Sequence, residues 1–126
     1  MEQLKVKVVK KVIHTGQRDI IKFQIITHCF ENHIQLSNNE LSCLTLLGAY
    51  GEHELSEFCN SAVDEKIFKT AQTVRNFLTK ATKLGLVDKK EKQENSKKKI
   101  SLNEDLQVQT KAPLVLDFKL AYVTQE

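Results

Sequence analysis

The chain has 126 residues, of which 40% are hydrophobic and 28% charged, and it carries a formal net charge of +3. This length supports one ordinary hydrophobic core, no uninterrupted apolar run approaches the roughly 20 residues of a membrane span, and the lysine-bearing N-terminus lacks the pattern of a secretory signal. We therefore expect a single-domain cytoplasmic protein with no membrane segment.

The N-terminal part of the chain predicts a β-hairpin. Residues 4–13 alternate between apolar and basic side chains, and residues 20–26 resume the alternation after a polar loop that contains Gly16. Two β-branched runs around a short glycine-bearing loop are typical of paired antiparallel strands. The segment 28–35 fits either a continuation of the second strand or a loop. Because an isolated hairpin is marginal in water, we expect it to pack on the rest of the domain or on a partner.

Two helices are predicted in the middle of the chain. Ser37 and Glu40 form the S-x-x-E pattern of a capping box, in which each side chain satisfies the backbone amide of the other residue. The following residues, 41–51, are apolar on nearly every side, which places this helix at the centre of the core. Residues 52–61 predict a short second helix with an acidic outer side.

The stretch 66–84 predicts a long amphipathic helix. Its apolar residues recur at spacings of three and four, and Gly85 follows where a helix commonly ends. A short apolar segment at 86–87, a lysine-rich run to Lys99 and an alternating segment at 100–102 come next. The order of helix, glycine, strand, basic loop and strand is that of a winged helix-turn-helix with a β-wing.

The last part of the chain predicts strands. Residues 106–109 fit a short strand, Pro113 interrupts the pattern, and apolar residues then recur at every second position over 114–122. This period is that of a strand. We expect residues 104–126 to form a C-terminal strand extension that, like the hairpin at 1–35, contributes to a homo-oligomer or to assembly with a partner.

Charge is unevenly distributed along the chain. Residues 66–99 contain eleven Lys or Arg and three carboxylates, a local charge of +8, whereas residues 40–65 contain six carboxylates and no Lys or Arg. A localised basic field beside an amphipathic helix is expected of a phosphate-binding surface.

The segments LSNNELSCLTLLGAYGEHELSEF and FKTAQTVRNFLTKATKLGLVDKK together resemble the winged helix-turn-helix superfamily, most nearly its MarR-like branch. The resemblance covers roughly residues 36–103, and its most characteristic part is the ending K-x-G-L-V-x-K-K at 83–90. It implies an α+β fold with a three-helix core and a basic β-wing, here flanked by an N-terminal β-hairpin and a C-terminal β-strand. It also implies that the helix at 66–84 enters the major groove of double-stranded DNA while the wing lies along the backbone or the minor groove.

The polar side of the helix at 66–84 supplies the candidate DNA contacts. Glutamine and asparagine can make paired hydrogen bonds to an adenine edge, whereas lysine and threonine suit phosphates. Gln72, Thr73 and Asn76 are therefore candidate base readers, and Arg75 fits either role. The candidate phosphate contacts are Lys69, Lys80 and Lys83 on the helix and Lys89, Lys90, Lys92, Lys97, Lys98 and Lys99 in the wing. The alternatives are a merely solvated helix face and lysines that keep an edge strand from pairing.

Other site chemistry finds little support. His28, Cys29 and His33, with Cys43 or Cys59, match no standard zinc spacing, so we expect no metal, and the three cysteines are interpreted as reduced core thiols. No glycine-rich phosphate loop or hydrolase motif is present. We expect neither a cofactor nor enzymatic activity.

Three functional hypotheses follow. The first is a DNA-binding transcriptional regulator or replication-related factor. The second is a structural or assembly protein, such as a phage virion or connector component, that uses the winged-helix fold for protein contacts. The third is a homodimerising adaptor in which the strand at 114–122 adds to the hairpin edge of a neighbour.

Overall fold

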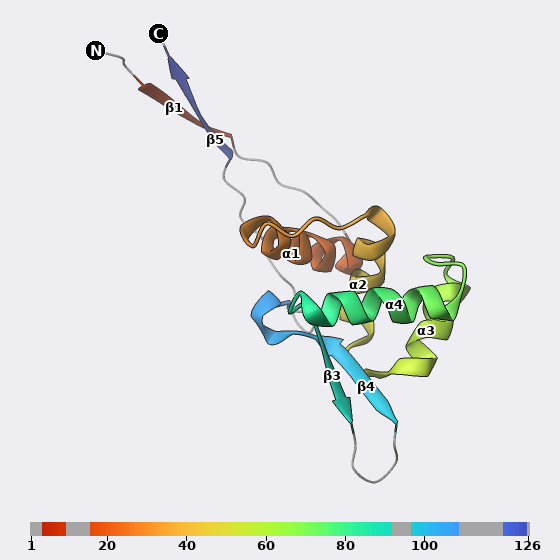
Figure 1. Cartoon of the computed structure of the whole chain (residues 1–126). Helices are drawn as coiled ribbons and strands as arrows, with labels where there is room; N and C mark the ends of the chain where they lie inside the picture. Colours follow the sequence, from red (N-terminus) through yellow and green to blue (C-terminus); the bar gives the residue numbers. More distant parts are fainter. Residues whose placement is uncertain (1–3, 10–15, 92–96, 109–119, 126) are drawn as a thin grey trace.

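The structure, a computed structural model, describes residues 4–9, 16–91, 97–108 and 120–125 (Figure 1). The described residues form four helices: α1 (Gln17–Glu31), α2 (Asn38–Tyr50), α3 (Leu55–Asp64) and α4 (Ala71–Lys83). A small antiparallel sheet has the order β2-β4-β3, from β2 (His53–Glu54), β3 (Val87–Glu91) and β4 (Lys98–Leu102). A second sheet pairs β1 (Leu4–Val9) with β5 (Leu120–Gln125), and a short 3-10 helix, η1, covers Glu104–Leu106.

The hydrophobic core lies where α2, α3, α4 and the three-stranded sheet meet. From α2 it takes Leu44, Leu46 and Leu47, and α3 and α4 contribute Phe58 and Leu78, all buried. Ile100 of β4 closes the core from the sheet side. Because α2 is buried on most of its circumference, its nearly continuous apolar sequence is explained by its central place.

The capping box predicted at the start of α2 is confirmed. The Ser37 hydroxyl accepts a hydrogen bond from the Glu40 amide at 3.2 Å, and the Ser37 amide donates to Glu40 Oε1 at 2.9 Å. At the other end of α2, Gly51 has a φ of 76°, a left-handed conformation that glycine adopts without a Cβ clash. Both helix ends therefore follow from local sequence.

The predicted N-terminal β-hairpin is wrong, because its second strand is the helix α1. Ile21, Ile25 and Cys29 recur every fourth residue and are buried, whereas Phe23 is 37% exposed. Ile21 and Ile25 are four residues apart, so they share one side in a strand and also in a helix. Their packing against α2 is that of a helix. Arg18 of α1 also donates to Glu65, at the end of α3, at 2.8 Å.

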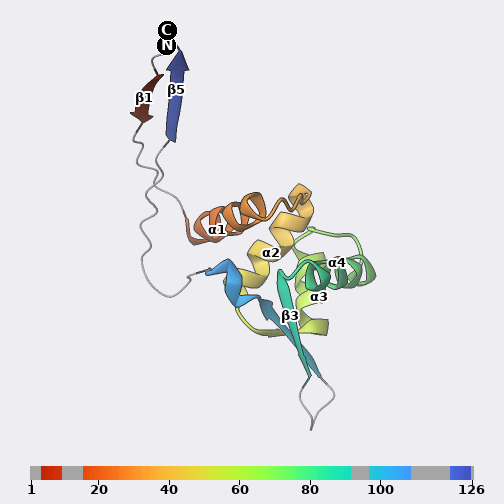
Figure 2. The ribbon, with the colours of Figure 1, turned by 60° about the vertical axis from the view of Figure 1, so that its left-hand side comes forward.

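The first strand, β1, pairs instead with the C-terminal strand. Their antiparallel register places Leu4 opposite Gln125 and Val9 opposite Leu120. The strand predicted at 114–122 is thus confirmed at 120–122 and continues to Gln125, while the predicted positions 114–119 lie outside the described residues. Figures 1 and 2 show this two-stranded ribbon standing away from the helices.

The strand predicted at 106–109 is wrong over its described part. Residues 104–106 form η1, and Gln107 follows with a left-handed φ of 52°. The Asn103 side chain accepts from the Asp105 amide at 2.8 Å, a local bond that favours a turn. Leu106 is buried in the core, which explains why an apolar residue occurs there.

Helices α3 and α4 both begin later in the chain than predicted. The short helix predicted at 52–61 spans Leu55–Asp64. The long helix predicted at 66–84 begins only at Ala71, because the Thr70 hydroxyl caps it by accepting from the Thr73 amide at 3.2 Å. Lys66 has a φ of 61°, so the chain turns there and cannot continue a helix.

The wing is a two-stranded antiparallel hairpin of β3 and β4, in which Val87 pairs with Leu102 and Glu91 with Lys98. In Figures 1 and 2 the hairpin extends beyond the helices, starting near the end of α4. Together with β2, which pairs with β4, and the helices α2, α3 and α4, it makes the fold winged-helix-like. Helix α1 adds a fourth helix to that arrangement by packing on α2.

Candidate nucleic-acid interface

Helix α4 has a buried side and a polar side. Val74, Phe77, Leu78 and Ala81 are buried, and their spacing of three and four residues fixes how the helix is turned. The opposite side carries exposed residues that share one helical face. We call this set the ridge, and it consists of Gln72, Asn76, Thr79 and Lys83.

Two of the predicted base readers contact each other on the ridge. Gln72 Nε2 donates a hydrogen bond to Asn76 Oδ1 at 2.9 Å. The two residues are one helical turn apart and both are exposed. Their amides therefore lie on the outer side of α4.

The residues that flank the ridge are held by other helices. On one side, Arg75 donates to Ser56 of α3 at 3.0 Å. On the other side, Lys80 donates to Glu40 of α2, also at 3.0 Å. These two predicted contact residues therefore link α4 to its neighbours, and each keeps further N–H donors for a ligand.

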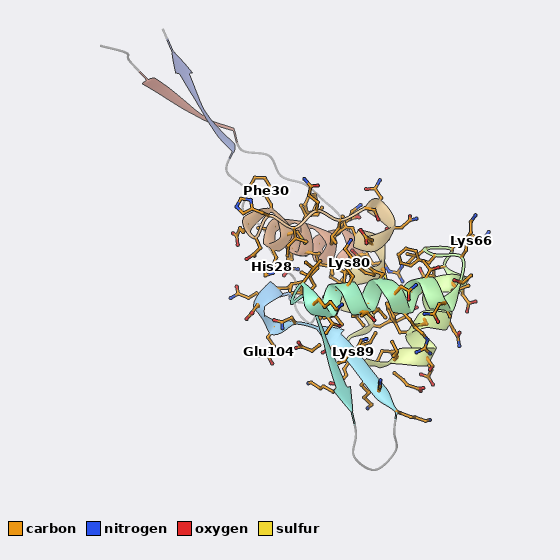
Figure 3. All side chains as sticks on the ribbon, in the orientation of Figure 1. His28, Phe30, Lys66, Lys80, Lys89 and Glu104 are labelled. Atoms are coloured by element: carbon orange, nitrogen blue, oxygen red, sulfur yellow. The ribbon has the colours of Figure 1, made fainter. Side chains whose placement is uncertain are left out.

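Two further predicted residues belong to the start of α4. Thr73 provides the amide that Thr70 caps, and the two hydroxyls lie 2.8 Å apart. Lys69 is exposed but precedes the helix. Figure 3 shows Lys66 before the first turn of α4 and Lys89 on β3 after its last turn, so basic residues lie at both ends of the ridge.

The wing has two faces, and its lysines are divided between them. Val87 and Ile100 are buried, so the face they share packs on the helices. Lys89, directly opposite Ile100, lies on this face, and its ammonium donates to the Thr79 hydroxyl at 3.4 Å. Lys89 is thereby joined to the ridge, and Lys98 belongs to the same face by its pairing with Glu91.

The other face of the wing carries Lys90 and Lys99, which lie directly opposite each other. Glu52 lies 3.6 Å from the Lys90 ammonium and 4.0 Å from that of Lys99. This carboxylate relieves the repulsion between two like charges. Lys97 is exposed just before β4, and the predicted contact Lys92 lies outside the described residues.

The acidic segment 40–65 is partly neutralised by basic residues from distant parts of the chain. Glu40 pairs with Lys80, Glu52 with the two wing lysines, and Glu65 with Arg18. For Glu40, burial alone would raise the pKa, but hydrogen bonds from Ser37 and the Lys80 ammonium outweigh it and hold the pKa below its ordinary value. Sequence reasoning missed these pairings because they join residues far apart in the chain.

The cysteines are buried as predicted. Cys29, Cys43 and Cys59 are all free and buried. Burial, followed by the nearby Cys59 and Glu40, raises the pKa of Cys43 to about 12, and burial also raises the pKa of Cys29 and Cys59. Among the described residues, no three His, Cys, Asp or Glu side chains come together as a metal site requires, and no helix there is long and apolar enough to cross a membrane.

No protein-family model matches the sequence, and no curated protein matches it significantly. Among solved structures, the chain is similar to PerR from Streptococcus pyogenes, a protein of peroxide sensing and gene regulation, with a TM-score of 0.54 and 10% sequence identity. The alignment covers 78% of this chain but only 63% of that one, so this chain spans less than two thirds of its length. At this identity the similarity supports a winged-helix-like fold and does not select the MarR-like branch.

Proposed function

We propose that the protein binds double-stranded DNA by placing the ridge of α4 in the major groove, and that it acts as a regulator of transcription or a replication-related factor. The observation that carries the proposal is the exposed Gln72–Asn76 pair on the outer side of a helix whose inner side is fixed in the core. Amide side chains are suited to the hydrogen-bonding edges of bases in the major groove.

The phosphate contacts in this proposal lie at the end of the ridge and beside it. Lys83 lies on the last turn of α4, and Lys89 approaches the ridge from the wing. Each lysine that replaces a counterion at a phosphate steepens the log–log salt dependence of binding by about 0.9. Since Lys80, Lys90 and Lys99 pair with carboxylates, we expect fewer phosphate contacts than the count of basic residues implies.

The test is a fluorescence-anisotropy titration of the full chain with a labelled random duplex at two salt concentrations, run beside light scattering. We expect binding that weakens steeply as salt rises. A discrete higher oligomer with no anisotropy change at low salt would contradict DNA binding and favour the assembly hypothesis.

The β1–β5 ribbon favours oligomer formation as a second role. Two strands without further support are marginal in water, and pairing within the chain uses one edge of each strand. We propose that a second copy or an assembly partner covers the ribbon. This differs from the adaptor hypothesis, because β5 already has a partner strand within its own chain. Deleting residues 113–126 should lower the number of chains per particle measured by light scattering, and an unchanged oligomeric state would contradict this role.

A further inference from the structure

The hydrogen bond between Gln72 and Asn76 bears on how α4 would read sequence. Gln72 is the second residue of α4 and Asn76 lies one turn later. Both point directly away from the buried side of the helix. The bond at 2.9 Å favours one orientation of the Gln72 amide group relative to the helix. The neighbouring polar residues have other partners: the Thr73 amide donates to Thr70, Arg75 donates to Ser56 and Lys80 donates to Glu40.

The bond leaves Gln72 with one amide hydrogen and its carbonyl oxygen for a ligand. The major-groove edge of adenine offers one acceptor, N7, and one donor, the N6 amino group. Guanine offers two acceptors on the same edge. The free amide hydrogen of Gln72 could bond to only one of them, and the Gln72 carbonyl oxygen would face no donor. A side chain that is already oriented loses less freedom on binding than one that must be ordered.

We infer that Gln72 reads a single adenine and that Asn76 is a positioning residue that acts through Gln72, so the two amides form one specificity element. The inference rests on the proposed DNA binding and makes it more specific. Two independent readers would contact two base pairs, whereas this coupled pair recognises one. The sequence alone is compatible both with two independent base readers and with one coupled pair, and the hydrogen bond favours the coupled pair.

The test is selection from a random duplex pool, with the full-length chain compared with Gln72→Ala, Asn76→Ala and Asn76→Asp. We expect the unmodified chain to enrich an adenine at one position, with a preference of about 5- to 150-fold over other bases. Gln72→Ala and Asn76→Ala should both lose the preference at that same position. Asn76→Asp keeps an acceptor for Gln72 and should retain the preference, although its negative charge lowers overall affinity.

Lys83→Ala is the matched control on the same ridge, since it should weaken binding without changing which base is preferred. Preferences lost at two different positions by the two alanine variants would overturn the inference while leaving DNA binding intact. An unchanged preference in Asn76→Ala would also overturn it. If the unmodified chain enriches no site and binds no duplex at low salt, the proposed function itself fails. Because both residues are exposed, circular dichroism should show all variants folded.

Discussion

The ammonium group of Lys89 lies 3.4 Å from the hydroxyl oxygen of Thr79, and this contact joins the wing to the outer side of α4. The next residue along β3, Lys90, points to the opposite face of the wing and lies beside Glu52. Two adjacent lysines in one strand thus have different surroundings, which makes them a matched pair for experiment.

Lys89→Ala should weaken duplex binding more than Lys90→Ala. Lys89 lies next to the ridge, so its loss removes a phosphate contact and should reduce the log–log salt slope by about 0.9. Anisotropy titrations of both variants over a salt series measure the slopes. Equal losses of affinity in the two variants would contradict binding through the face of the wing that carries Lys89.

Glu52→Gln should raise affinity for duplex DNA at low salt. Glu52 lies near the ammonium groups of Lys90 and Lys99, so its removal leaves both charges unneutralised and strengthens the positive field around the wing. We expect a several-fold gain that fades as salt screens the charges. Glu104→Gln, in η1, changes the net charge equally and serves as the control. A gain of the same size in both variants would mean that only net charge matters.

Replacing Ile25 with alanine should cost about 2–5 kcal/mol in the free energy of unfolding, because the residue is fully buried in α1. Phe30→Ala, in the same helix, should change it by no more than about 0.5 kcal/mol, since Phe30 is 82% exposed. Figure 3 shows Phe30 on the side of α1 that faces away from α4. Urea titrations measure both values, and similar costs would be inconsistent with helix α1.

Stability should fall at acid pH in part because of Glu40. Hydrogen bonds outweigh burial and hold its pKa below the ordinary value of 4.5. A carboxyl group with a lowered folded-state pKa stabilises the fold fully above its unfolded pKa and loses that contribution as pH falls through the folded value. Glu40→Gln should therefore show a smaller drop in urea midpoint between pH 7 and pH 3 than the unmodified chain. An equal drop would mean that other carboxylates account for the whole acid effect.

The three cysteines should resist a thiol reagent in the folded protein at neutral pH. All are buried and their pKa values are raised, so little thiolate is present. Quantifying thiols in buffer and in urea should give slow reaction in the first case and fast reaction of all three in the second. Fast reaction of even one in buffer would contradict its burial.

Local signals account for what the sequence predicts well. The capping box at Ser37 and the three- and four-residue spacing in α4 each specify a helix within one segment. The predicted start of α4 lies too early in the chain. Two local features set it at Ala71: the left-handed conformation of Lys66 and the cap that Thr70 provides. The exposed Gln72 and Asn76 follow directly from the helical period.

Long-range packing decides what the sequence predicts poorly. Ile21 and Ile25 fit both a strand and a helix, and only contact with α2 selects the helix. The pairing of β1 with β5 joins opposite ends of the chain. The carboxylates that neutralise Lys80 and Lys90 also come from distant segments, so the sequence overstates the basic field.

Chemical-shift mapping by NMR tests the central claim most directly. The isotope-labelled full chain is titrated with an unlabelled duplex at low salt, and backbone amide shifts are followed along the chain. We predict the largest changes at residues 72–83 of α4 and at 87–91 of β3. Changes confined to α1 and η1, with the ridge unaffected, would contradict major-groove binding by α4.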